Sequence, residues 1–151
     1  MTDPQFFTLA DAKAWLLEHV DDGAHCPCCT QLAKVYRRKI NSSMARSLII
    51  LHRGGNDWQY VPDVVGSKSR EESKLAYWGL LEEAAEKRDD GGRQGWWRVT
   101  VRGHMFARDE LMVQKYARIY DGRCLGHVGS PVSIVDALGT KFDYRELMAG
   151  V

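Results

Sequence analysis

The sequence lacks the apolar runs and the leader that membrane insertion or secretion requires. No stretch approaches the ~20 consecutive apolar residues that span a bilayer. The first residues, MTDPQFFTL, do not show a basic segment followed by an apolar one. We therefore expect a cytoplasmic protein that makes no use of a membrane.

The sequence also lacks common catalytic motifs: G-x-S-x-G, H-E-x-x-H, G-x-x-x-x-G-K and G-x-G-x-x-G are all absent. One pattern imitates a nuclease: Pro62-Asp63 and then Glu72-Ser73-Lys74, in which two acids would hold Mg²⁺ and the lysine would assist the attacking water. Such nucleases place the second acid and the lysine on a strand, whereas this stretch has a helical apolar face. We expect no enzyme, with a Mg-dependent nuclease as a remote alternative.

Acidic residues are absent between Thr30 and Arg53, although the net charge of the whole chain is only +1. That stretch holds six basic residues, whereas the first 22 residues hold five acids and one base. An acid-free basic stretch attracts polyanions, or it pairs with an acidic segment of the same fold. Both interpretations stay open at this point.

The length of 151 residues suits one compact domain of mixed α+β class. We expect an N-terminal helix and cysteine knuckle over residues 1–29, a core over 30–112, and a C-terminal hairpin and short helix over 113–151 that pack on this core.

Helical signals occur at several places. Thr8 can cap a helix from Leu9 to about Val20, with Asp11 in its first turn. Val64 and Val65 allow a turn or two of helix. Further helices are expected at Gln31 to Lys39, from Ser42 or Ser43 to Gly54-Gly55, from Ser69 onward, and at Phe142 to Met148. In the helix that begins at Ser69, we expect Leu75, Trp78 and Leu81 to form the face that points into the core.

Strand signals fall between these helices. The clearest is Trp96 to Val101, in which the neighbouring tryptophans must point to opposite faces. One tryptophan should enter the core. The C-terminal hairpin is expected to cover the other; the alternative is that this tryptophan stays exposed and marks an interface. Further strands are expected at Asp57 to Val61 and in a hairpin of Tyr116 to Tyr120 with Arg123 to Val128 around Asp121-Gly122, while Glu82 to Lys87 suits either strand or helix.

The segment from Ser69 to Phe106 combines these elements in a recognisable order. The helix runs into Gly79-Leu80-Leu81-Glu82, followed by a charged wing at Asp89 to Gly95, a strand that ends in Val99-Thr100, and the turn Arg102-Gly103-His104-Met105-Phe106 into more helix. In this order the segment resembles the winged helix-turn-helix family, in particular its MarR-like branch. The resemblance implies a winged core in which one helix, the reading helix, enters the major groove of DNA while the wing grips the backbone or minor groove.

The resemblance also implies which residues contact DNA. On the reading helix these are Lys68, Ser69, Arg70, Ser73, Lys74 and Tyr77, and on the wing they include Arg88 and Arg93. Their basic groups would bind phosphates in a salt-dependent way, while a few side chains would read bases. Most of the chain also resembles small bacteriophage proteins of unassigned function, which implies a phage-encoded protein.

The cysteines are unevenly distributed, with three of the four in Cys26-Pro27-Cys28-Cys29. Cys26 and Cys29 have the spacing of a zinc knuckle, and Cys124 and His127 offer a second pair of ligands. These four residues predict a structural zinc site, in which Cys28, His25 or His19 could replace one ligand. The alternative is that the cysteines are small hydrophobic residues or idle thiols.

The leading hypothesis from the sequence is therefore a non-catalytic protein that binds double-stranded DNA. The alternative, from a different functional class, is a protein-interaction module on the same scaffold. It would bind a host or phage protein through the wing and the aromatic residues beside it.

Overall fold

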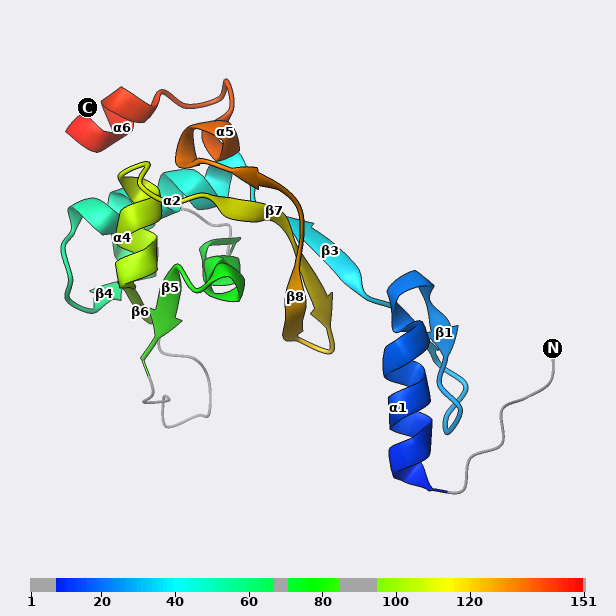
Figure 1. Ribbon diagram of the computed structural model, residues 1–151. Helices are drawn as coiled ribbons and strands as arrows, with labels where there is room; N and C mark the ends of the chain where they lie inside the picture. Colours follow the sequence, from blue (N-terminus) through cyan, green and yellow to red (C-terminus); the bar gives the residue numbers. More distant parts are fainter. Residues whose placement is uncertain (1–7, 67–70, 85–94, 151) are drawn as a thin grey trace. The chain divides into compact units, whose positions relative to one another are not determined.

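The computed structural model describes residues 8–66, 71–84 and 95–150 (Figure 1). The chain groups into two compact units: residues 1–38 with 118–126, and residues 39–117 with 127–151. These units do not follow the segments expected from the sequence, because the tip of the C-terminal hairpin groups with the N-terminal residues. The fold is mixed α+β with small sheets, as expected.

The first unit is built on one helix and a short ribbon. Helix α1 (Leu9–His19) begins as predicted, with the Thr8 side chain accepting a hydrogen bond from the Asp11 backbone N–H. The 3₁₀-helix η1 (Val20–Asp22) follows, and β1 (Ala24–His25) then pairs antiparallel with β2 (Leu32–Ala33). Asp21 forms an ion pair with Arg118 of the hairpin tip.

The helix predicted over Gln31 to Lys39 is wrong, because these residues form β2 and then β3 (Tyr36–Lys39). Leu32 and Tyr36, two large apolar residues of this segment, are exposed. The buried residue of the segment is Val35, whose backbone N–H donates to the Val20 carbonyl. Pairing of β2 with the nearby β1, and of β3 with β7, which is distant in sequence, therefore decides the conformation here.

The second unit is organised around α2 (Ser42–Arg53). Asn41 caps this helix by accepting a hydrogen bond from the Met44 N–H, so the cap lies one residue before the serines that we expected. Six residues of the helix are buried, including Leu48 and Leu51. The remaining elements up to residue 107 are β4 (Gln59–Tyr60), α3 (Val61–Val65), η2 (Glu71–Trp78), β5 (Leu81–Glu83), β6 (Trp96–Val99) and α4 (Val101–Ala107).

A three-stranded antiparallel sheet lies within this unit in the order β4-β6-β5. Glu82 is ambiguous from sequence and lies in β5, opposite Arg98 of β6. Trp97 points into the core and is 7% exposed, as one tryptophan of the pair should. Trp96 is 40% exposed and contacts Tyr60 with ring centroids 5.5 Å apart, so the expected cover by the hairpin is wrong.

A second sheet has the order β3-β7-β8, in which β7 (Val113–Tyr120) and β8 (Arg123–Val132) form the predicted hairpin. Asp121 and Gly122 connect them with φ angles of 50° and 72°, the positive values that a tight type I′ turn needs. Two short capped helices, α5 (Ile134–Leu138) and α6 (Tyr144–Ala149), complete the chain.

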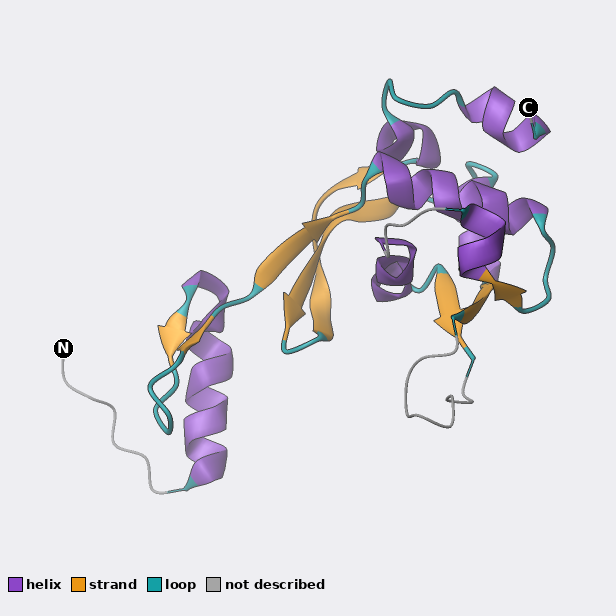
Figure 2. Cartoon of the chain, turned by 180° about the vertical axis from the view of Figure 1, so that it is seen from behind, coloured by secondary structure: helices purple, strands orange, loops and turns teal. Residues whose placement is uncertain are grey.

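Thr100, which follows β6, forms hydrogen bonds to Gly79 and Leu80, the two residues just before β5. Its backbone N–H donates to the Leu80 carbonyl at 3.1 Å, and its hydroxyl donates to the Gly79 carbonyl at 2.6 Å. The same hydroxyl accepts from the Gly103 N–H at 3.0 Å and so caps α4. Figures 1 and 2 show α4 between α2 and the β4-β6-β5 sheet.

No helix within the described ranges is long and apolar enough to cross a bilayer.

We expect Gly103→Ala to destabilise the second unit strongly. An added Cβ would lie 2.1 Å from the Leu80 carbonyl oxygen and 2.7 Å from Val99 Cγ1. Such overpacking costs about 1–3 kcal/mol, which urea unfolding would measure. Arg102→Ala, at an exposed position of the same helix, should stay within about 0.5 kcal/mol of wild type. Equal stability of the two variants would contradict this account of the close contact.

Candidate nucleic-acid interface

The element at the expected position of the reading helix is η2, a 3₁₀-helix rather than the α-helix that the sequence predicted. Its inward residues include Leu75 and Trp78, and the Trp78 Nε1–H donates to the Gln114 carbonyl at 2.8 Å. Figures 1 and 2 show η2 beside α2 and β5. The predicted inward residue Leu81 is also buried, but it belongs to β5.

The 3₁₀ geometry changes which side chains share a face. Because this helix has three residues per turn, residues three apart lie one above another. Lys74 therefore lies over Tyr77, with its Nζ 5.8 Å from the centroid of the tyrosine ring. Ser73 falls on a different face, although an α-helix would have brought it near Tyr77. Ser73 and Tyr77 are half-buried, as is Lys74.

The structure brings together part of the predicted DNA-binding set. Ser73, Lys74 and Tyr77 lie on η2 in the second unit. The other predicted residues fall outside the described ranges: Lys68, Ser69, Arg70, Arg88 and Arg93. Of the residues that imitated a nuclease, Asp63 lies on α3 while Glu72 and Lys74 lie on η2, so neither of the last two is on a strand.

The outer face of the β4-β6-β5 sheet carries exposed aromatic side chains. Tyr60 is opposite Trp96 and is 37% exposed. Trp58, just before β4, is 40% exposed, and the guanidinium carbon of Arg98 lies 4.4 Å from its ring centroid. Arg98 also forms an ion pair with Glu82 across β6 and β5. Below, "the aromatic face" means Trp58, Tyr60 and Trp96.

The predicted zinc ligands are divided between the two units. Cys26, Cys29 and Cys124 belong to the first unit, and His127 belongs to the second. Hydrogen bonds from the backbone amides of Cys29 and then Cys28 lower the pKa of the Cys26 thiol. The His127 Nε2 lies 2.8 Å from the Tyr77 carbonyl oxygen. Among the described residues, no three His, Cys, Asp or Glu side chains form a group that could hold a metal ion.

A histidine pair in the second unit was not foreseen from the sequence. His52 of α2 and His104 of α4 are 52 positions apart, yet their Nδ1 atoms lie 2.6 Å apart. One nitrogen must donate while the other accepts, so a single proton lies between the rings. Within the described part of the chain, the buried Nε2 of His104 has no hydrogen-bond partner. Both histidines line a cavity of about 360 Å³ together with Arg108.

The surroundings of this pair disfavour its protonation. Burial lowers the pKa of His52 below its ordinary value of 6.5, and the nearby His104 and Arg108 lower it further. Burial also lowers the pKa of His104, again with a contribution from Arg108. The pair is therefore neutral near pH 7. It supplies a structural contact between α2 and α4 rather than a positive charge for DNA.

Comparison with protein-family models, curated proteins and solved structures gives no match to this chain.

From the histidine pair we predict that the protein becomes less stable as the pH falls below about 7. Because the folded-state pKa values lie below 6.5, the unfolded chain binds more protons between the lowered values and 6.5, and stability decreases through that window. NMR titration of the imidazole resonances of His52 and His104 should give midpoints below 6.5. Urea unfolding at pH 7.5 and 5.5 should show a smaller pH effect in His52→Gln/His104→Gln than in wild type. Midpoints at or above 6.5 would contradict this prediction.

Proposed function

We propose that the protein is a non-catalytic, phage-encoded, winged-helix protein that binds duplex DNA in the cytoplasm. The observation that carries this proposal is the order of elements in the second unit. Helix α2 is followed by β4, α3, η2, β5 and β6, and the strands pair in the order β4-β6-β5. A winged helix-turn-helix has three helices and a three-stranded sheet of this kind, with its wing between the last two strands.

In this proposal η2 is the reading helix, and the segment between β5 and β6 is the wing. Leu75 and Trp78 anchor η2 in the core, while the partly exposed Lys74 and Tyr77 are available to a ligand. The ammonium group of Lys74 would bind a phosphate, and the ring of Tyr77 would contact a base or sugar. The wing sequence supplies Arg88 and Arg93, and Lys68 and Arg70 precede η2.

The decisive experiment is a fluorescence-anisotropy titration with labelled random-sequence duplex DNA at low and moderate salt. We expect binding that weakens steeply as salt increases, because phosphate contacts release counterions. The variant Lys68→Glu/Arg70→Glu/Lys74→Glu should bind about tenfold or more weakly. Its salt dependence should become shallower, by a slope of about 0.9 for each phosphate that the variant no longer neutralises.

A matched control keeps the same change in charge at a different place. Lys13→Glu/Lys34→Glu/Arg123→Glu reverses three exposed basic residues of the first unit and should bind DNA nearly as wild type does. Equal weakening in both triple variants would mean that only net charge matters. No binding of wild type at low salt would overturn the proposal.

The second candidate function is the protein-interaction module, and the aromatic face favours it. Three neighbouring aromatic residues that are each more than a third exposed, Trp58, Tyr60 and Trp96, are typical of the anchors at protein interfaces. Here the partner would be a host or phage protein. Recovery of a partner from nuclease-treated extract that is abolished in Tyr60→Ala/Trp96→Ala, but kept in Tyr36→Ala, would support this function.

We further propose that a structural zinc ion stabilises the chain. The Cys26 knuckle fits this ion, because amide hydrogen bonds that lower the Cys26 pKa favour the thiolate that binds metal. His127 fits as well: a ligand histidine commonly donates one ring N–H to a carbonyl oxygen, as its contact with Tyr77 would allow.

We expect elemental analysis of the purified protein to find about one zinc ion per chain. Cys26→Ser, Cys29→Ser, Cys124→Ser and His127→Gln should each reduce the zinc content and the melting temperature, since bound metal stabilises the folded state. Cys28→Ser is the matched control within the knuckle and should retain the metal. Wild-type protein without zinc after expression in zinc-supplemented medium would contradict the proposal.

A further inference from the structure

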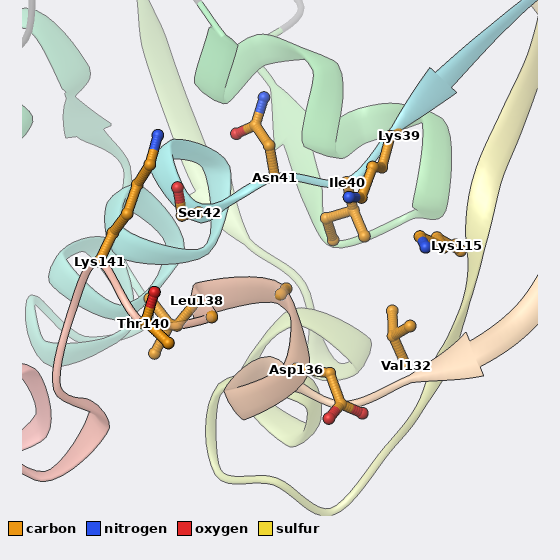
Figure 3. A pocket seen from close by; sticks show the side chains of 12 residues that line it. Lys39, Ile40, Asn41, Ser42, Lys115, Val132, Asp136, Leu138, Thr140 and Lys141 are labelled. Atoms are coloured by element: carbon orange, nitrogen blue, oxygen red, sulfur yellow. The ribbon is translucent and has the colours of Figure 1, made fainter.

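A cavity of about 490 Å³ in the second unit is lined by three lysines from three separate segments (Figure 3). Lys39 ends β3, Lys115 lies in β7, and Lys141 lies between α5 and α6. Figure 3 shows Lys39 and Lys115 on the strand side of the cavity, and Lys141 near Thr140 on the other side. None of these lysines belongs to the proposed DNA-binding set.

The backbone holds two of the lysines in place. The Ile40 N–H donates to the carbonyl of Lys115 at 3.0 Å, which fixes the end of β3 beside β7. Lys39 and Lys115 thus remain neighbours although they are distant in sequence. Because like charges repel, an anion bound between the two ammonium groups would be attracted to both.

Among the described residues that line the cavity, the one acid is Asp136, and it is already engaged. Its carboxylate accepts a hydrogen bond from the Ser133 N–H at 2.9 Å in the capping box of α5. Three positive groups against one negative group leave a net charge of +2 on these lining residues. The first turn of α2 adds further positive potential, because it contains no acid and its N-terminus borders the cavity.

The remaining polar groups of the lining suit an oxyanion. The hydroxyls of Ser42 and Thr140 are hydrogen-bond donors. The Asn41 side-chain oxygen accepts from the Met44 N–H, so its amide NH₂ is the part of that side chain that can donate to a ligand. Several donors beside a positive charge are the features that bind phosphate groups in proteins.

We propose that this cavity binds a phosphate group. The group belongs to a free phosphorylated small molecule or to the backbone of a nucleic acid, because both present the same oxyanion chemistry. The inference does not depend on the proposed DNA-binding function: the cavity is lined by other residues, and it can be tested without DNA.

The test is calorimetric titration of the full chain with inorganic pyrophosphate at constant ionic strength. Wild type should bind, and pyrophosphate should shift the backbone amide resonances of Ser42, Gly139 and Thr140 in NMR spectra. Lys39→Gln/Lys115→Gln/Lys141→Gln should bind about tenfold or more weakly, since three attractive charges are removed. Lys13→Gln/Lys34→Gln/Arg123→Gln removes the same charge from the first unit and should bind as wild type does.

A single substitution tests the same site in case the triple variant does not fold. Lys141→Glu changes an exposed residue of the α5–α6 connection and should also weaken binding while the NMR spectrum stays that of a folded protein. No heat and no shifts with wild type, or equal weakening in the first-unit control, would overturn the proposal.

The two sources of phosphate are separated by adding duplex DNA as a second probe. If Lys141→Glu weakens pyrophosphate and DNA binding alike, the cavity holds a backbone phosphate. If it weakens only pyrophosphate binding, the ligand is a free phosphorylated molecule. If wild type binds pyrophosphate but no duplex DNA, the proposed DNA-binding function is contradicted while the phosphate-binding cavity is supported.

Discussion

The second unit depends on the junction at Thr100, where one side chain and one backbone amide connect two separate stretches of the chain. Thr100 binds the carbonyls of Gly79 and Leu80 and also caps α4. This fixes the end of η2 relative to β6, and it sets the direction in which α4 leaves the sheet. Gly103 is required one turn later because no Cβ fits against the Leu80 carbonyl. The contact of α4 with α2, including the histidine pair, then follows.

Neighbouring residues in the sequence are sufficient to predict helix caps and tight turns, because the hydrogen bonds and the positive φ angles of these features involve only a few consecutive residues. The predictions of the Thr8 cap and the Asp121-Gly122 turn are correct, because each depends on residues only a few positions apart. The strand predicted over Trp96 to Val101 is correct up to Val99, whereas Thr100 caps α4 and Val101 begins that helix. The prediction for residues 31–39 is wrong, since their conformation is decided by pairing with β1 and β7. The same limit applies to the candidate sites. The His52–His104 contact and the cavity of Lys39, Lys115 and Lys141 join residues that no sequence spacing relates.

If η2 is the reading helix that we propose, its 3₁₀ form has a physical consequence for the recognition of DNA. At about 2.0 Å of rise per residue it is longer and thinner than an α-helix of the same sequence. Its side chains form three straight rows instead of one broad stripe, and the row that contains Lys74 and Tyr77 also begins with Glu71. In the proposed complex a carboxylate is therefore aligned with the phosphate-binding lysine. Repulsion between Glu71 and the DNA backbone would reduce nonspecific affinity and increase the relative weight of base contacts.

The distribution of charge within the second unit explains how a net charge of +1 is compatible with binding to polyanions. Some acidic side chains are engaged within the fold: Glu82 pairs with Arg98, and the carboxylates of Asp136 and Asp143 accept backbone hydrogen bonds as caps of the short helices α5 and α6. Lys39, Lys115 and Lys141 face a cavity whose described lining contains one acid, itself one of these caps. Because screening confines electrostatic attraction to about 8–10 Å at physiological salt, a phosphate responds to these nearby groups rather than to the total charge. A surface can thus attract phosphate on a nearly neutral protein, provided that its acids are bound within the fold.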